Sequence, residues 1–128
     1  MTPVVVDASA LAAVAFQESG WEDVLARLDG QSLHAPPLLG FELASVACKK
    51  IARQPRDASK IVQALVEALG PLSGITWHDV PPVEAVLIGR AAGITPYDAS
   101  YLWLAGWLGA DLVTLDRRLA RASDALHP

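Results

Sequence analysis

Two aspartates in this sequence follow directly after runs that predict buried strands. Asp7 comes after the Val-Val-Val run at 4–6, and Asp116 comes after the Leu-Val-Thr-Leu run at 112–115. If these strands are parallel, both carboxylates lie at the carboxyl edge of the sheet, where open α/β sheets place their ligands. Each aspartate also begins a predicted helix, so capping of that helix is an alternative reason for either residue.

Two further acids lie on helix faces that should turn toward the interior. Asp98 opens a predicted helix whose same face carries Tyr101 and Leu102. Glu42 lies inside another predicted helix, among apolar neighbours. Lys49 is two turns away from Glu42, too far for a routine ion pair. A carboxylate in such a place faces solvent, pairs with a base or binds a ligand.

Converging carboxylates repel one another, so a fold that gathers them needs a cation or shifted pKa values. Oxygen ligands without cysteine or histidine favour Mg²⁺ or Mn²⁺, and such sites are typical of phosphoryl transfer. We therefore predict one acidic site, whose members serve both as metal ligands and as catalytic residues: Asp7, Glu42, Asp98 and Asp116.

The tripeptide Asp-Ala-Ser recurs at 7–9, 57–59 and 98–100, each time before a predicted helix. Helix capping explains the recurrence without a duplication. Asp57 follows a polar turn instead of an apolar strand, so we predict that it only caps its helix.

The elements that must position these acids alternate between strand and helix, which predicts an α/β fold with three α/β/α layers around a central parallel sheet. We expect one domain, 1–128, without a linker or break. Expected strands are 4–6, 32–35, 75–78 and 112–115; expected helices are 8–17, 21–28, 38–52, 58–69, 82–92 and 97–108, with a short last helix after 116.

Composition narrows the function classes. Hydrophobic residues make up 52% of the chain, which indicates a globular protein, and no apolar run or leader-like start predicts a membrane or secreted location. The single cysteine, Cys48, excludes an intrachain disulfide, so we expect a cytoplasmic protein. A net charge of −4 disfavours a passive nucleic-acid-coating protein. It disfavours a nuclease less, because a bound cation reverses the local charge.

The four acidic segments together resemble the PIN domain, most closely a VapC-type toxin nuclease. The resemblance covers nearly the whole chain and rests on the segments 4–11, 95–102 and 112–119, together with Glu42 early in the helix after Pro36-Pro37. It implies a magnesium or manganese site at the four acids, with Ser9 and Thr114 orienting the carboxylates. It also implies RNA as substrate, a homodimer and a cognate antitoxin protein as partner.

Two departures from the family pattern are visible. The family often has asparagine three residues after the helix glutamate, where this chain has Ser45. The family also usually ends in a further strand, but 123–128 contains no strand-like run. We therefore expect the final edge strand to be short or missing.

The resemblance and the acids predict a Mg²⁺-dependent endoribonuclease that cleaves RNA phosphodiesters with metal-activated water. A metal-free ribonuclease would need a positioned acid and base, often histidine, and His34, His78 and His127 show no such spacing. Surface or strand-end roles suit them better. Candidate phosphate-binding bases, for which ordinary solvated charge is the alternative, are Lys49, Arg53 and Arg117.

Three other functions stay open at this point. A PIN nuclease of RNA processing outside any toxin pair, or a catalytically idle PIN domain that only binds RNA or protein, would share the same motifs. A phospho-acceptor receiver domain also uses strand-end aspartates, but it needs adjacent acids after the first strand and a lysine late in the chain. This sequence has no lysine after Lys60.

Overall fold

The computed structural model describes residues 1–126 and gives the chain four strands and seven α-helices in that range. The strands are β1 (Pro3–Val6), β2 (Ser32–Ala35), β3 (Ile75–Trp77) and β4 (Asp111–Val113). The helices are α1 (Ala8–Ala15), α2 (Trp21–Leu28), α3 (Leu38–Arg53), α4 (Ala58–Leu69), α5 (Pro82–Ala92), α6 (Pro96–Leu108) and α7 (Arg117–Leu126), with short 3₁₀ turns at Pro55–Asp57 and Pro71–Ser73.

The four strands form one parallel sheet in the order β3-β2-β1-β4. From β1 the chain moves outward through β2 to β3, and it then returns to the other side of β1 as β4. The order of the strands therefore reverses between β1 and β4. A crevice opens outside the carboxyl ends of parallel strands at such a reversal. Asp7 and Asp116 follow the two strands that flank it.

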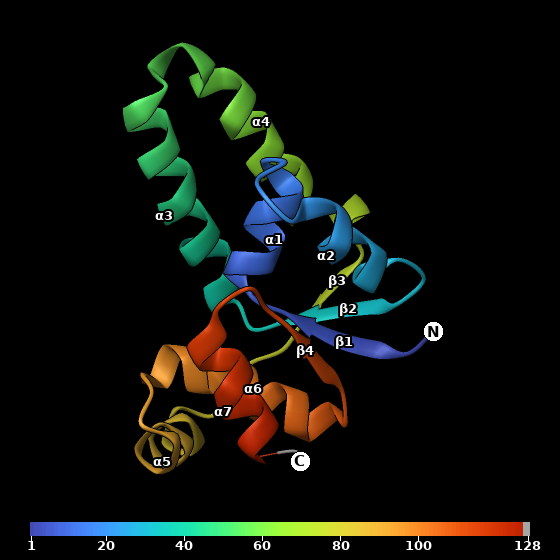
Figure 1. The fold of residues 1–128 in the computed structure, drawn as a ribbon, viewed down its shortest axis with the longest axis vertical. Helices are drawn as coiled ribbons and strands as arrows, with labels where there is room; N and C mark the ends of the chain where they lie inside the picture. The colour runs from blue at the N-terminus through green and yellow to red at the C-terminus, as the bar shows by residue number, and fades with distance from the viewer. Residues whose placement is uncertain (127–128) are drawn as a thin grey trace.

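Helices cover both faces of the sheet, as Figure 1 shows. Val4 and Val6 pack in a core with residues of α1, α2 and α3, whereas Val5 packs on the opposite face with Tyr101 of α6 and Leu119 of α7. The alternation follows from the two-residue period of a strand, and a strand covered on both faces must be apolar throughout. The predicted three-layer parallel architecture is confirmed.

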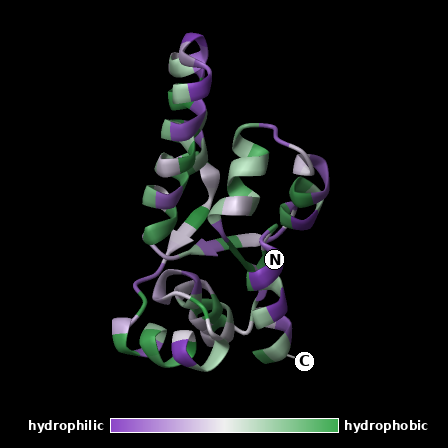
Figure 2. Cartoon of the chain, turned by 60° about the vertical axis from the view of Figure 1, so that its left-hand side comes forward, coloured by the Kyte–Doolittle hydropathy of each residue, from purple (hydrophilic) through white to green (hydrophobic). Residues whose placement is uncertain are grey.

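Helices α3 and α4 pack against each other and rise away from the sheet as an arm. Polar and apolar residues alternate along this arm, and polar residues gather at its tip (Figure 2). The base of the arm lies at the sheet because α3 begins directly after Pro36-Pro37 at the end of β2. Glu42 is thus carried near the carboxyl edge of the sheet, while Arg53 lies toward the tip.

The last strand differs from the expectation. β4 ends at Val113, so Thr114 and Leu115 lie beyond it as irregular backbone. No strand follows β4 as far as residue 126, because α7 occupies that stretch. The expected absence of a further edge strand thus holds up to residue 126. Positions 127–128, including His127, lie outside the described residues.

Asp57 occupies the capping position that the sequence predicts, but it does not make the expected capping contact. Asp57 stands at the start of α4, but its side chain makes no capping hydrogen bond. The residue belongs to a 3₁₀ turn with ψ of 9°, instead of the extended backbone usual for a capping aspartate. Within the described part of the chain, no helix is long and apolar enough to span a membrane.

Candidate active site

Asp7 is the most firmly held acid of the four. Its side chain is 5% exposed and accepts three hydrogen bonds. Oδ1 accepts from the backbone N–H of Ala10 at 3.0 Å and from the Ser9 hydroxyl at 2.8 Å, and Oδ2 accepts from the Thr114 hydroxyl at 2.6 Å. The Ala10 contact caps α1. Asp7 is therefore both a capping residue and a buried carboxylate at the strand edge.

Ser9 and Thr114 join Asp7 to the segment after β4. Their hydroxyl oxygens lie 3.2 Å apart, and the Ser9 Oγ accepts the Leu115 N–H at 2.9 Å. Thr114 Oγ1 accepts the N–H of Asp116 at 3.0 Å. The two hydroxyls that the resemblance assigned to carboxylate orientation thus both contact Asp7.

Asp116 caps the last helix. Its Oδ1 accepts the Leu119 N–H at 3.0 Å, while the residue itself is exposed. As with Asp7, an aspartate at the start of a helix can cap that helix and also belong to the acidic site. One carboxylate oxygen serves the cap, and no hydrogen bond to the other is found among the described residues.

Glu42 finds its partner on α6. The Tyr101 hydroxyl donates to Glu42 Oε1 at 2.5 Å, and Tyr101 is only 1% exposed. The sequence indicates that Tyr101 lies on the inward face that follows Asp98, but it does not indicate this bond. A helix register identifies a face, whereas the meeting of α3 with α6 depends on the tertiary fold.

Asp98 does not cap α6. The helix begins at Pro96, and the Thr95 hydroxyl accepts the backbone N–H of Asp98 at 3.1 Å. Thr95 therefore caps the helix, and the Asp98 carboxylate, in the first turn, is left half-buried without a capping task. The capping interpretation of Asp98 was wrong. The role of its carboxylate must therefore be sought in the residues around it.

The electrostatics tie the four acids together. Burial raises the pKa values of Asp7, Glu42 and Asp98 above the ordinary carboxyl range. Neighbouring negative charge raises them further: Asp116 acts on Asp7 and Asp98, while Asp7 and Asp98 both act on Glu42. Hydrogen bonds from Thr114 and Tyr101 oppose these rises. The structure thus brings all four acids within electrostatic reach of one another.

Positive charge does little to neutralise the acids. The charge of Arg118 lowers the pKa of Asp98, but this guanidinium donates its hydrogen bond to the Gly93 carbonyl. Up to residue 126, the ion pair found is Lys50 with Glu18 at 3.0 Å, away from the acidic site. Among residues 1–126, the acids therefore form a concentration of negative charge that no ion pair neutralises.

The donor chemistry of this set fits a hard divalent cation, since all the side chains are carboxylates on a partly buried sheet edge. Among residues 1–126, however, no three acidic, histidine or cysteine side chains approach closely enough to hold an ion as they stand. Carboxylates would have to draw closer to share a cation.

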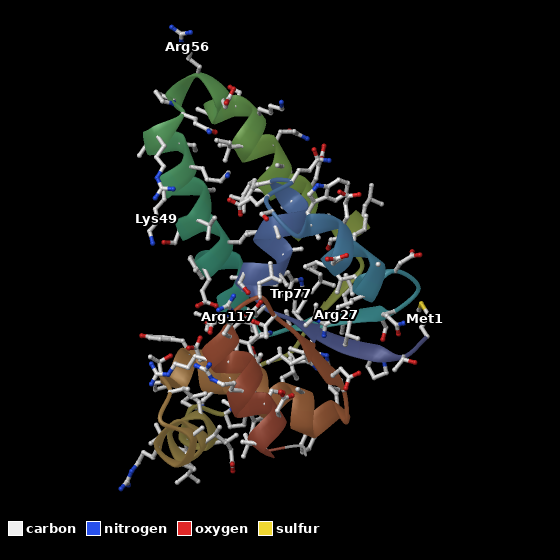
Figure 3. The ribbon with its side chains drawn as sticks, in the orientation of Figure 1. Met1, Arg27, Lys49, Arg56, Trp77 and Arg117 are labelled. Carbon is white, nitrogen blue, oxygen red and sulfur yellow. The ribbon has the colours of Figure 1, made fainter. Side chains whose placement is uncertain are left out.

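Three exposed bases were predicted to bind substrate: Lys49 and Arg53 on α3, and Arg117 at the start of α7. Figure 3 shows Lys49 on the side of α3 that faces away from α4, and Arg117 where α7 begins, directly after Asp116. Lys50 differs from Lys49, since it pairs with Glu18 and lies over the Phe16 ring.

The histidines show a contact that sequence reasoning missed. His34 Nδ1 and His78 Nε2 lie 2.8 Å apart, and His34 Nε2 lies 3.0 Å from the Ser32 hydroxyl. Burial and the charge of His78 lower the pKa of His34. His78 directly follows β3, as a strand-end role requires. The parallel pairing of β2 with β3 brings the two rings together, and only a correct sheet order could have predicted it.

The sequence profile of the PIN domain matches residues 4–125, which include all four acids. The chain belongs to the PIN domain family. This PIN domain is 35% identical over 127 residues to Ribonuclease VapC3 of Pyrobaculum aerophilum, and the alignment covers 96% of each chain. It is also 30% identical to Ribonuclease VapC9 of Mycobacterium tuberculosis, across 98% of this chain and 94% of that protein.

A solved structure supports the same assignment. The crystal structure of PAE2754 from Pyrobaculum aerophilum superposes on this PIN domain with a TM-score of 0.76 and 25% identity, covering 98% of this chain and 92% of that one. The resemblance to VapC-type PIN domains that the sequence motifs indicated is therefore confirmed. PIN-domain proteins of this kind generally use a divalent metal ion.

Proposed function

We propose that this protein is a Mg²⁺-dependent endoribonuclease that acts as the toxin of a toxin–antitoxin pair. One observation carries the proposal: carboxylates from separate elements gather at the reversal of strand order, where neighbouring acids raise the pKa values of Asp7, Glu42 and Asp98, and no ion pair among residues 1–126 offsets them. Such an arrangement costs stability unless a cation occupies it. The names of the VapC relatives supply the reaction class.

In this proposal Asp7, Glu42, Asp98 and Asp116 hold Mg²⁺ or Mn²⁺ at the edge between β1 and β4. A divalent cation held there would activate water and offset charge on a phosphodiester. Ser9 and Thr114 each donate one hydrogen bond to the Asp7 carboxylate, one to either oxygen, and so fix its orientation toward a cation.

The bases would hold the rest of the substrate. Lys49, Arg53 and Arg117 are exposed and free of ion pairs among the described residues, so their charge is available to RNA phosphates. Arg117 adjoins Asp116 in sequence, and the other two follow the α3 arm away from the acidic site. An RNA strand would thus run from the acidic site along α3 toward the tip of the arm.

VapC toxins generally pair with VapB antitoxins and bind RNA. We propose the same kinds of partner for this protein, a cognate antitoxin and an RNA substrate, together with self-association as a homodimer. Expression without the antitoxin should stop growth, and co-expression with the protein encoded beside it should restore growth. Light scattering on the purified chain would show a mass of two protomers or refute the dimer.

Cleavage of end-labelled total RNA tests the enzymatic activity. Partner-free protein should give discrete cuts with Mg²⁺, and EDTA or Asp98→Asn should abolish them. Asp57→Asn is the matched control, because Asp57 occupies the same Asp-Ala-Ser tripeptide but lies outside the acidic site. A folded, metal-loaded wild type that cuts nothing would favour a PIN domain that only binds RNA or protein.

Analysis of the product ends tests the chemistry. Attack by water leaves 5′-phosphate and 3′-hydroxyl ends, whereas attack by the ribose 2′-hydroxyl leaves a cyclic phosphate. Cyclic phosphate in the products would refute the metal-dependent route. Cutting without growth arrest in cells would instead indicate an RNA-processing nuclease outside a toxin pair.

A further inference from the structure

Glu42 depends on one contact for its position. The Glu42 carboxylate accepts the hydroxyl proton of Tyr101 at 2.5 Å, and no other hydrogen bond to it is found among residues 1–126. Asp7, by comparison, accepts hydrogen bonds from three donors, and Asp116 is fixed by the N–H of Leu119. A glutamate side chain with free torsions loses entropy when it binds an ion, which weakens binding.

The side chain of Tyr101 is held rigidly by its surroundings. It is 1% exposed and packs in the core that contains Val5, Leu104 and Leu112. A buried phenol needs a hydrogen-bond partner, and Glu42 is the one this structure provides. Because the ring cannot move without disturbing that core, its hydroxyl presents a fixed donor to α3.

The position of Tyr101 in the chain gives the contact a second consequence. Tyr101 lies three residues after Asp98 on α6, so the two side chains share one face of that helix. The hydrogen bond therefore ties the carboxylate of α3 to the helix that carries another acid of the site. One Glu42 oxygen is used by Tyr101, and the other remains free for a cation.

We propose that Tyr101 is a positioning residue that holds Glu42 in place for the divalent cation. This role rests on the proposed metal site. Tyr101 itself touches neither cation nor RNA. It supplies a donor that keeps the α3 carboxylate beside Asp98, so its removal weakens metal binding through Glu42 alone.

Isothermal titration calorimetry of metal-free protein with Mn²⁺ tests this role without measuring RNA cleavage. Tyr101→Phe removes only the hydroxyl and should weaken Mn²⁺ binding about tenfold, within the range found when partners of metal ligands are removed. Tyr97→Phe is the matched control, because it lies on the same helix but is 63% exposed. This control should bind Mn²⁺ like the wild type. Circular dichroism should show native folding in each variant.

Glu42→Gln completes the test as a double-mutant cycle. Tyr101→Phe should cause no further loss of Mn²⁺ affinity when Glu42 is already glutamine. An equal loss in both backgrounds would show a general structural effect and overturn the positioning role, as would unchanged affinity in Tyr101→Phe. A wild type that binds neither Mn²⁺ nor Mg²⁺ would refute the metal site itself, an outcome distinct from the other two.

Discussion

Replacement of Thr114 by valine should destabilise the protein in a pH-dependent way. Valine keeps the β-branched shape, so packing at this 9% exposed position changes little. The substitution removes the 2.6 Å hydrogen bond to Asp7 Oδ2 and the acceptor of the Asp116 N–H. Water can replace the second bond, because Asp116 is exposed, but it reaches the buried Asp7 poorly. The lost hydrogen bond to Asp7 therefore sets the size of the decrease in stability.

A hydrogen bond to a charged group contributes about 1.5–3 kcal/mol, so we expect the free energy of unfolding to fall by about 2 kcal/mol. For a chain of this length that corresponds to a melting temperature about 5–10 °C lower. The Thr114 hydroxyl lowers the pKa of Asp7 by stabilising the ionised carboxylate. Its contribution is thus largest when Asp7 is ionised and shrinks as the pH falls through the pKa of Asp7 in the folded protein.

Urea denaturation in EDTA at pH 8 and pH 5 measures both effects. Thr76→Val is the matched control, since Thr76 lies in β3 of the same sheet and its side chain makes no hydrogen bond among those found up to residue 126. Equal stability of the two variants at both pH values would refute the idea that Thr114 supports a buried, charged Asp7.

Three other predictions follow from features of the fold. The carboxyl groups with raised pKa values should make metal-free protein more stable to urea as the pH falls from neutral toward the ordinary carboxyl range, and millimolar Mg²⁺ should remove that trend, because a bound cation favours the ionised forms. Gly89→Ala should cost about 1–3 kcal/mol in thermal unfolding, because its Cβ would lie 2.9 Å from the Ile94 carbonyl oxygen, whereas Gly40→Ala should be tolerated, with its nearest contact at 3.8 Å. Alanine at each of the three predicted phosphate-binding bases should weaken RNA binding in EDTA, and it should reduce by about one the slope of log affinity against log salt concentration. The control Arg90→Ala on α5 should change neither quantity. Unchanged slopes would show that these bases are only solvated surface charges.

Local signals in the sequence predicted the elements well. The runs at 4–6 and 32–35 became strands, and the ends of most helices lie within two residues of the expected ones, because proline and glycine mark them. The apolar Val-Val-Val run also predicted a strand covered on both faces. Asp7 and Asp116 could be placed at one edge for the same reason, since parallel strands end on the same side.

Other features could not be read from local patterns. Thr95 took the capping position expected of Asp98, because proline at the first helical position moved the start of α6 upstream. The Tyr101–Glu42 and His34–His78 contacts join residues 59 and 44 positions apart. Such contacts depend on the order of strands and the packing of helices, which no single stretch of sequence encodes.

The central place of β1 affects when the molecule can work during its synthesis. β1 leaves the ribosome first, yet its neighbour β4 and the Thr114 hydroxyl that holds Asp7 come about a hundred residues later, at a separation of 107 for that bond. At a synthesis rate of about 5–20 residues per second, the interval is about 5–20 s. Until then Asp7 lacks its partner and Asp116 does not exist. A nascent or prematurely ended chain that stops before Asp116 therefore cannot bring the four acids together, so the proposed ribonuclease activity would begin only after that residue has been made.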